Sequence, residues 1–309
     1  PMQLPLERRW HSDRRIDLIA QLGPLRRGSG DPTWHSESSG AVWRTTMTPD
    51  GPGVERLAVD AAAGEVHQLA WGPGSGWLAE RLPVLLGDDD EDAEAFDPPE
   101  VLAATAKRYP GWRVGRTNRV LEALIPAILE QKVTGKEAWL GWRTLVRQFG
   151  EPPPSGDGVP QGLQVVPSVD VWAQIPSWAW HKAGVDSKRS STVLRAVERA
   201  VKLEELTGID ATVAHYRLRE IVGVGIWTAA ETAQRALGDP DAVSYRDYHL
   251  AQQMVYQFTG RRDGTDEQLA QLLLPFAGHR YRVQRLSELA PLRRPRRGPR
   301  MTVHDMRHI

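Results

Sequence analysis

The stretch Leu218–Leu250, LREIVGVGIWTAAETAQRALGDPDAVSYRDYHL, decides the fold, because it links a glycine hairpin between two helical segments to an isolated aspartate further along. A Gly-Val-Gly turn at the start of a helix, here at 223–225, leaves backbone N–H groups unpaired and pointing outward. These N–H groups form a compact binding site for a phosphate, and this site needs no charged side chain. Asp247 supplies a carboxylate beside that phosphate site. Each half of the pattern means little alone, and only the combination is informative.

This combination resembles the pattern of the helix-hairpin-helix DNA glycosylases, which consists of an apolar helix end, a glycine hairpin, a second helix and an aspartate that opens a later helix. The turn at 223–225 matches the hairpin, and Asp247 matches the catalytic aspartate. Within that superfamily the chain is most similar to the 3-methyladenine DNA glycosylase II branch, because Trp227 stands where bifunctional members carry a lysine nucleophile. A weaker similarity covers 128–138 and 184–200, and the likeness extends over roughly residues 98–289.

The composition sets outer bounds on what the chain can be. Its 309 residues are enough for two domains or one large one, and 40% hydrophobic with 25% charged residues is ordinary for a soluble globular protein. Charges interrupt the apolar stretches well before bilayer-spanning length, and the first residues contain no apolar core of the signal-peptide kind, so we expect no membrane partner and a cytoplasmic location. The absence of cysteine excludes disulfides, zinc–thiolate sites and iron–sulfur clusters. Some related glycosylases carry such a cluster, and the resemblance therefore places this chain with the cluster-free ones.

The charges are balanced in number but not in position. The sequence has 39 Lys plus Arg against 39 Asp plus Glu. An acidic run lies at 88–97, whereas 280–309 contains nine arginines against only Glu288 and Asp305. A locally basic face is what contact with DNA phosphates requires, so the basic segment is a candidate for such contact. A solubilising tail is the alternative interpretation.

The pattern of residues predicts the α+β class, with an N-terminal antiparallel β-sheet domain and a larger all-α helix-hairpin-helix glycosylase domain. Strand-favouring residues at 41–50, 54–64 and 65–72 alternate between turn residues, and 76–87 looks like a helix packed on the resulting sheet. The acidic segment 87–99 has too few apolar side chains to bury much surface and is the expected linker. We therefore expect domains at 1–97 and 98–290 and a basic C-terminal tail at 291–309.

Beyond the acidic segment, the apolar spacing becomes helical. Val120, Leu121, Leu124, Ile125 and Ile128 recur at intervals of three and four, as one face of a helix requires. Leu194, Val197 and Val201 repeat the same spacing. The segment 151–162, EPPPSGDGVPQG, is expected to form an exposed loop that divides the helical domain.

The resemblance implies a DNA glycosylase, and the chemistry of that reaction suits a single carboxylate. Cutting an N-glycosidic bond leaves positive charge on the sugar, so a site must stabilise an oxocarbenium-like centre and direct water to it. An alkylated, cationic base is a good leaving group and needs no separate strong acid. We therefore assign both tasks to Asp247, as a hypothesis. The alternative is structural, because an aspartate just before the run YHLAQQMVYQF is a natural N-cap.

The base must also leave the duplex, which requires a grip on the DNA backbone and a wedge. The amides of Gly223 and Gly225 are the first candidates for the grip, helped by the positive end of the helix that begins near Ile226. The alternative for the hairpin is a simple tight turn between helices. Four further positions are assigned to backbone contact by the resemblance: Val224, Thr228, Lys188 and Arg189.

The resemblance places the wedge at Gln131 and Lys132. Relatives often insert an apolar side chain here, whereas Lys132 is charged and would instead reach a phosphate or the orphaned base. A solvated helix face is the alternative for Lys132.

The base pocket is expected at Trp227, Glu231, His279 and Tyr248. Trp227 offers a π-face on which an electron-poor alkylated purine can stack, and Glu231 lies one helical turn further on. His279 falls where the resemblance implies an aromatic wall. The alternatives are a core tryptophan, a surface ion-pair partner and an ordinary half-buried histidine, respectively.

Trp227 has a negative implication as well. An indole cannot form the Schiff base that a lysine forms in bifunctional glycosylases, so we expect a monofunctional enzyme that leaves an abasic site. The nine histidines lack the paired spacing of a zinc site, so no metal and no cofactor is expected, although a monovalent cation at the hairpin is compatible with the sequence.

The expected partner is double-stranded DNA containing damaged bases, and the chain is expected to be a monomer. Two other functions stay open. The first is a non-catalytic helix-hairpin-helix DNA-binding module, which would need neither Asp247 nor Trp227. The second is a repair enzyme of different chemistry, a lyase or a glycosylase for deaminated bases, in which Glu231 or His279 would have to assist a neutral leaving base.

Overall fold

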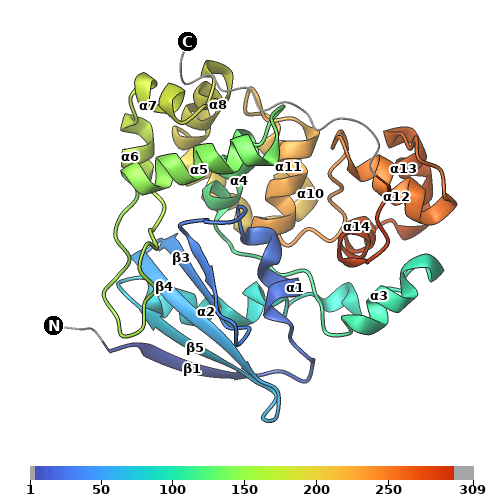
Figure 1. Ribbon diagram of the computed structural model, residues 1–309, viewed down its shortest axis with the longest axis horizontal. Coiled ribbons are helices and arrows are strands. Elements are labelled where there is room, and N and C mark those ends of the chain that lie inside the picture. Colours follow the sequence, from blue (N-terminus) through green and yellow to red (C-terminus); the bar gives the residue numbers. More distant parts are fainter. Residues whose placement is uncertain (1–3, 296–309) are drawn as a thin grey trace.

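The computed structural model describes residues 4–295, in which an antiparallel sheet near the N-terminus is followed by a mainly helical part (Figure 1). The sheet has five strands in the order β1-β5-β4-β3-β2. The strands are β1 (Leu6–His11), β2 (Trp34–Ser36), β3 (Val42–Thr48), β4 (Gly51–Asp60) and β5 (Glu65–Trp71). This arrangement confirms the predicted α+β class. Most of the predicted basic tail, from residue 296 onward, lies outside the described residues.

Apolar side chains alternate between the two faces of the sheet along its strands, so both faces are buried. Val42 pairs with Leu57 across β3 and β4, and both lie on the face that packs against α1 (Leu18–Leu22) and α2 (Ser75–Leu85). Successive side chains of a strand point to opposite faces. Trp43, which follows Val42, and Val54, three residues before Leu57, therefore point to the opposite face. The three strands and the helix predicted from 41–87 are thus confirmed.

The second face of the sheet is covered by the segment 151–165. Beyond the bridge at Glu151, the residues 151–162 form a loop as predicted, and many of them are exposed, but the inner side of the loop packs on the sheet. Glu151 forms an isolated antiparallel bridge with Val165. Gly156 lies so close to the Trp71 ring that a Cβ there would be 2.5 Å from it. Trp71 stacks on Trp43 at a centroid distance of 5.5 Å. The proline- and glycine-rich composition looked solvated, but here it allows the backbone to lie flat against two indoles.

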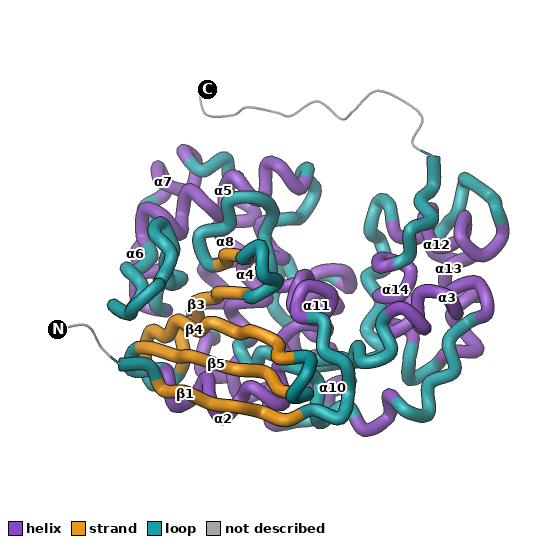
Figure 2. The backbone as a smooth tube through the Cα atoms, turned by 60° about the horizontal axis from the view of Figure 1, so that its bottom comes forward, coloured by secondary structure: helices purple, strands orange, loops and turns teal. Residues whose placement is uncertain are grey.

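The helices of the second part form two groups with α11 between them (Figures 1 and 2). One group shares a core with α11, and the other has a core of its own around α12–α14. The helices are α3 (Ala103–Arg108), α4 (Val120–Leu129), α5 (Gly135–Phe149), α6 (Val169–Gln174), α7 (Ser177–Lys182), α8 (Ser187–Val197), α9 (Ala200–Glu204), α10 (Ala211–Leu218), α11 (Ile226–Thr232), α12 (Leu250–Thr259), α13 (Asp266–Leu273) and α14 (Arg280–Leu289). Shorter helical turns are η1 (Gly23–Leu25), η2 (Glu91–Ala93), η3 (Glu100–Leu102), η4 (Glu205–Gly208), the π-helical η5 (Ala233–Leu237) and η6 (Leu274–Phe276).

The acidic segment is anchored to the helical part rather than free. Asp90 forms a two-pronged ion pair with Arg282 of α14, and both side chains are almost completely buried. Asp90 also accepts a hydrogen bond from the Val114 amide at 2.8 Å. A solvated linker was predicted from composition alone. The structure instead joins the acidic run to the arginine-rich helix, so the opposite charges that cancel in the sequence total also meet in space.

Within residues 4–295, every helix falls short of the length and apolar content that crossing a bilayer requires.

The contact between the sheet and α4 contains a carboxyl group whose pKa is shifted. Glu122 accepts a hydrogen bond from the Met47 amide of β3 at 2.7 Å. Burial raises the pKa of Glu122 to about 7, although Arg119 and Arg44 oppose this shift. Because the folded pKa exceeds that of the unfolded chain, the folded state binds more protons between about pH 4.5 and 7. The contribution of Glu122 to stability is therefore present below this window and is lost as the pH rises through it.

We expect Glu122→Gln to remove this pH dependence while keeping the acceptor for the Met47 amide. The variant should be more stable than the wild type at pH 8, by on the order of 2–3 kcal/mol, and should show little advantage at pH 4.5. Urea denaturation of both proteins at the two pH values measures the difference. Parallel stability profiles for wild type and variant would contradict the assignment.

Candidate active site

The hairpin leaves a row of backbone amides at the start of α11. Gly225 occupies the N-cap position in an extended conformation, and helix α11 begins at Ile226, as predicted. The Ala229 amide bonds to the Gly225 carbonyl at 3.0 Å. The amides from Gly225 to Thr228 therefore precede the first helical hydrogen bond, which is the arrangement that receives an anion at a helix N-terminus.

Glycine is required at 223 for two reasons. Its φ of +101° lies in the region that side chains with a Cβ rarely adopt. In addition, a Cβ there would lie 2.2 Å from the Thr192 hydroxyl of α8. Val224, the middle residue of the hairpin, is buried in the core that α11 shares with α4 and α8. The hairpin thus packs against Thr192 on one side and is anchored by Val224 on the other. The Val224 amide bonds to the Ile221 carbonyl at 2.9 Å, which corrects the predicted backbone contact by Val224, whereas Gly223 and Gly225 are exposed.

Asp247 contacts both the hairpin helix and the helix that follows it. Its Oδ1 accepts from the amides of His249 and Leu250, at 2.7 and 2.9 Å. Its Oδ2 accepts from the indole N–H of Trp227 at 3.3 Å. The capping alternative is therefore real, because Oδ1 caps the start of α12. Oδ2 is nevertheless turned toward α11, so the two halves of the sequence motif meet at this carboxylate.

Glu231 lies one turn beyond Trp227 and is buried in a polar cluster. The Ser244 hydroxyl donates to its Oε1 at 2.5 Å, and Arg235 of η5 pairs with its Oε2 at 2.8 Å. The structure thus excludes the surface ion pair considered from the sequence. Both oxygens already have partners, so Glu231 influences a bound molecule mainly through its charge and through Ser244.

Gln131 ties the turn after α4 to the hairpin. Its side-chain amide donates to the Gly223 carbonyl at 2.9 Å and to the Thr228 hydroxyl at 2.8 Å. Thr228 itself is buried, and its hydroxyl is occupied by the hydrogen bond from Gln131, so its side chain is not available to a phosphate. Lys132 follows with an exposed side chain and a φ of +56°. Of the two predicted wedge residues, Lys132 alone projects from the turn, and Gln131 holds the turn in position.

Arg189 has a packing role that the sequence did not reveal. It is only 3% exposed and pairs with Asp186 at 2.6 Å. Its other nitrogens donate to the carbonyls of Leu129 and Gly184, at 2.7 and 2.9 Å. The predicted phosphate contact by Arg189 is corrected accordingly, because its guanidinium is occupied inside the protein.

Arg195 is a residue at the hairpin that sequence reasoning missed. Its guanidinium donates to the Val222 carbonyl at 3.2 Å. Lys188, Thr192 and Arg195 are spaced by four and three residues and so lie on one face of α8, the face toward the hairpin. This spacing was the available signal, since Lys188 had already been placed at the DNA backbone and Arg195 lies two turns further along the same face.

Two of the predicted pocket residues lie elsewhere. His279 stacks against Phe96 at a centroid distance of 5.4 Å, and its Nδ1 accepts from the Nε of Arg282 at 3.0 Å. It therefore packs against the acidic segment. Tyr248 is 76% exposed, with its ring against His249. None of the four predicted pocket residues lines the cavity described next, and Asp247 does not line it either.

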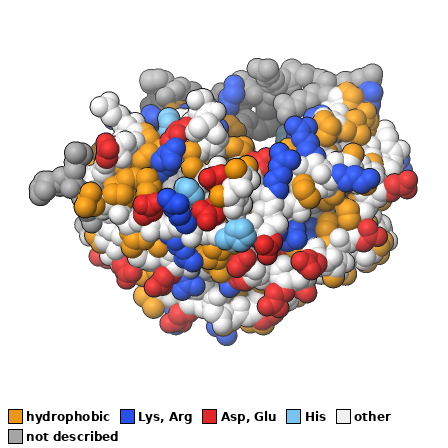
Figure 3. Space-filling view, turned by 90° about the horizontal axis from the view of Figure 1, so that it is seen from below, with side chains coloured by type: hydrophobic (Ala, Val, Ile, Leu, Met, Phe, Trp, Pro, Cys, Tyr) orange, Lys and Arg blue, Asp and Glu red, His pale blue; other side chains and the backbone are white. Residues whose placement is uncertain are grey.

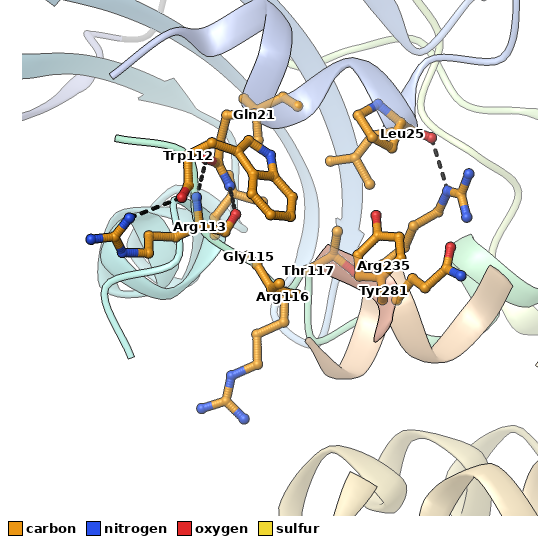
Figure 4. A pocket seen from close by; sticks show the side chains of 14 residues that line it. Gln21, Leu25, Trp112, Arg113, Gly115, Arg116, Thr117, Arg235 and Tyr281 are labelled. Carbon is orange, nitrogen blue, oxygen red and sulfur yellow. Dashed lines mark hydrogen bonds between the residues drawn. The ribbon is translucent and has the colours of Figure 1, made fainter. Parts of the chain in front are cut away.

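A small cavity, partly open to solvent, lies between η1, the segment 112–117, η5 and α14 (Figure 4). Trp112 and Tyr281 form an edge-to-face pair in its wall, with centroids 6.3 Å apart. Leu25 lies across from them, and Arg235 connects the cavity to Glu231. Neither Trp112 nor Tyr281 could be predicted as a lining residue, because each stands in an arginine-rich stretch without a motif.

Two buried ion pairs lie behind the site and join it to the sheet. Arg27, from the segment after η1, pairs with Glu130 at 3.3 Å, and burial raises the pKa of Glu130. Arg235 donates to the Pro24 carbonyl at 2.9 Å while it pairs with Glu231. The sheet part of the chain therefore holds both the turn that carries Lys132 and the helix that carries Trp227.

The surface seen from below in Figure 1, where β1 and α2 lie, carries acidic and basic side chains interspersed (Figure 3). A surface of mixed sign gives no continuous basic track for a phosphate backbone. In the part of the chain that the structure describes, no group of three or more His, Cys, Asp or Glu side chains is arranged to hold a metal ion.

Comparison with known proteins links the chain to DNA repair enzymes. No protein-family model matches it. It is 32% identical over 174 residues to the probable bifunctional transcriptional activator/DNA repair enzyme AlkA of two strains of Mycobacterium tuberculosis. The match covers 55% of this chain and 34% of that protein. The chain thus spans about a third of the length of the curated relatives it matches.

Solved structures resemble almost the whole chain. The 3-methyladenine DNA glycosylase from Archaeoglobus fulgidus superposes with a TM-score of 0.73 at 15% identity, covering 91% of this chain and 97% of that one. The 8-oxoguanine glycosylase/lyase from Clostridium acetobutylicum superposes with a TM-score of 0.68 at 11% identity, covering 93% and 99%. At these identities the likeness shows the fold. The expected resemblance to the helix-hairpin-helix DNA glycosylases is confirmed at that level.

The hairpin geometry predicts that its two glycines respond differently to substitution. Gly223→Ala should cost on the order of 1–3 kcal/mol of folding stability, because of both the positive φ and the clash with Thr192. Gly225→Ala is the matched control. It has a φ of −95° and nothing within 4 Å of an added Cβ, so it should cost less than about 1 kcal/mol. Chemical denaturation measures both, and equal losses would contradict this description of the hairpin.

Proposed function

We propose that this chain, which shares the fold of the helix-hairpin-helix DNA glycosylases, is a monofunctional DNA glycosylase. It cuts the N-glycosidic bond of alkylated purines, such as 3-methyladenine, in double-stranded DNA and leaves an abasic site. The observation that carries the proposal is the hydrogen bond from Trp227 to Asp247, because it brings the helix after the hairpin and the carboxylate to one point.

Asp247 is arranged for the charge that develops on the sugar. Its two carboxylate oxygens accept three hydrogen bonds, from the Trp227 indole and from the amides of His249 and Leu250. Because the donors fix the carboxylate in place, it faces an oxocarbenium-like sugar without having to reorganise. The oxygen bonded to Trp227 retains lone pairs for the sugar cation and for an attacking water.

The grip on the DNA backbone comes from the hairpin and from α8. The free amides from Gly225 to Thr228 receive one phosphate at the positive end of α11. Lys188 and Arg195 lie on the face of α8 toward the hairpin and add positive charge beside it. A monovalent cation that bridges hairpin carbonyls and the phosphate is compatible with this geometry. Lys132 projects from the turn that Gln131 holds against the hairpin, and it enters the space that the extruded base leaves.

The pocket for the extruded base begins at Trp227, whose ring offers a π-face to a cationic purine. Glu231 contributes negative charge one turn deeper, although its oxygens are bonded to Ser244 and Arg235. A cationic alkylated base is thus met by an electron-rich ring and a nearby carboxylate. This environment fits a leaving group that needs no proton from the protein.

We expect Asp247→Asn to lower the rate of base excision by at least about 100-fold, because an amide cannot neutralise the sugar cation. Asparagine can still cap α12, so folding stability should change by less than about 1 kcal/mol. The matched control is Asp210→Asn, which alters a capping aspartate of α10 that bonds to the Val213 amide. This control should excise bases at the wild-type rate.

The measurement is incubation with randomly methylated duplex DNA and identification of the released bases by mass spectrometry. Full activity in Asp247→Asn would remove Asp247 from the mechanism. A second candidate function, a non-catalytic DNA clamp, is favoured by the capping bonds of Asp247. It would be indicated if the wild type bound the DNA and released no base.

The indole at position 227 predicts that no covalent intermediate forms. Borohydride added during turnover should trap no protein–DNA adduct, because neither an indole nor a carboxylate forms a Schiff base with the opened sugar. A bifunctional glycosylase/lyase run in parallel serves as the positive control. An adduct that forms with this protein would show lyase chemistry and would overturn the monofunctional part of the proposal.

A further inference from the structure

Ser244 lies in the segment between η5 and α12, three residues before Asp247, and the proposed chemistry does not use its side chain. The residue is only 2% exposed. Its hydroxyl donates to Oε1 of Glu231 at 2.5 Å and accepts from the side-chain amides of Gln234 and Gln284, at 2.9 and 3.2 Å. The donor and both acceptor positions of this hydroxyl are therefore used inside the protein.

The two amides fix the direction of the bond to Glu231. Gln234 also donates to a backbone carbonyl of the same segment at 2.8 Å, so the nitrogen end of its side chain faces Ser244. The oxygen of Gln284 accepts from the Ser244 amide at 3.0 Å, which leaves its nitrogen to donate. The single hydroxyl hydrogen is thus directed at Glu231. Because Arg235 pairs with the other oxygen of this carboxylate, the acceptor is charged, and such hydrogen bonds are among the stronger ones.

Helix α11 holds the segment before α12 at two points. Trp227 and Glu231 are one helical turn apart and lie on the same side of the helix. Trp227 donates to Asp247, whereas Glu231 accepts from Ser244. The Asp247 amide donates to the Ser244 carbonyl at 3.2 Å, which closes a turn, 244–247, between the two points. The position of the Asp247 carboxylate relative to α11 therefore depends on where Ser244 is fixed.

This turn contains a strained residue that its surroundings must hold. Arg246, immediately before Asp247, has a φ of +67°, which residues other than glycine rarely adopt. The Arg246 amide donates to the carboxylate of Asp266, the first residue of α13, at 2.8 Å. The turn is thus held from α13 on one side and from α11 on the other. Apart from the reacting carboxylate itself, Ser244 provides the described hydrogen bond from the turn to α11.

We propose that Ser244 is a positioning residue for the cleavage of the N-glycosidic bond: anchored to Glu231, it fixes the turn from which Asp247 faces the sugar. This inference rests on the proposed function and adds a residue that touches neither the DNA nor the reacting atoms. It also gives Glu231 a task that requires no contact with the base, since both of its oxygens are bonded within the protein.

Ser244→Ala tests the inference, because it detaches the turn from Glu231 and leaves the Glu231–Arg235 pair in place. The readout is the ratio of the affinities for two duplexes, one with a cationic pyrrolidine in place of the sugar and one with neutral tetrahydrofuran. Neither duplex carries a base at that position, so a change in the ratio cannot arise from a contact with the base. We expect the ratio to fall at least about threefold, because Asp247 no longer faces the positive charge from a fixed position.

The rate of excision provides a second readout. At saturating protein, single-turnover release of bases from randomly methylated duplex DNA should slow by about tenfold in Ser244→Ala, since a small misplacement of a reacting group is costly. The protein concentration that gives the half-maximal rate should stay the same, because the contacts that bind the DNA are unchanged.

Ser287→Ala is the matched control. Ser287 of α14 is also completely buried, and its hydroxyl donates to Gln257 of α12, outside the turn 244–247. This variant should keep the wild-type ratio and excision rate. Loss of folded protein weakens binding to both duplexes equally, so the ratio separates positioning from stability. Ser244→Cys keeps the shape of the side chain and offers only a weak S–H donor, so it should also lower the ratio.

An unchanged ratio in Ser244→Ala, or in Ser244→Cys if only that variant folds, would overturn the inference and leave the proposed function standing. An equal fall in Ser287→Ala would overturn it as well, because the loss would then be general to buried serines. If the wild type itself binds the two duplexes equally and releases no base, the proposed function fails, and the inference fails with it.

Discussion

The hydrogen bond between the Trp227 indole and the Asp247 carboxylate is the interaction on which the rest of the site depends. Trp227 is set by the hairpin, since α11 can begin at Ile226 only because Gly223 turns the chain back with a positive φ against Thr192. Asp247 is set by α12, whose first amides it caps. The Asp247 carboxylate therefore contacts both α11 and α12, two helices that belong to different hydrophobic cores. In the proposed function, structural capping and catalysis by Asp247 do not compete, because the capping bonds are what hold the carboxylate still.

The sheet contributes to this geometry through buried charges. The pair Arg27–Glu130 joins the segment after η1 to the turn of Lys132. Arg235, which pairs with Glu231 of the Trp227 helix, donates to the Pro24 carbonyl of η1. Breaking a buried pair leaves an uncompensated charge and is strongly destabilising, so these contacts fix relative positions even where they add little net stability. Gln131 adds a neutral link between the same turn and the hairpin. The N-terminal sheet is thus part of the support of the site, and the surface on its lower side is mixed in charge (Figure 3).

Local patterns could be predicted from the sequence, and long-range partners could not. Strands β3 to β5 follow from the alternation of apolar and polar residues, and the hairpin and the start of α11 follow from the glycines. Both signals depend only on residues a few positions apart. The burial of Arg189, the role of Gln131 and the Asp90–Arg282 pair depend on partners up to 192 positions away. Arginine and aspartate are usually exposed, so composition gave the wrong expectation for them. Tyr281 was missed because no motif marks its position, whereas His279 was placed in the pocket by resemblance and packs against Phe96 instead.

The central claim is that Asp247 faces a developing positive charge on the sugar. Its most direct test is the affinity for duplex DNA that carries a cationic pyrrolidine in place of the sugar, compared with the neutral tetrahydrofuran analogue. The wild type is expected to bind the cationic duplex at least about tenfold more tightly, since binding of a transition-state charge is what catalysis requires. This preference should disappear when the carboxylate is replaced by an amide. Equal affinity of the wild type for the two duplexes would contradict the account.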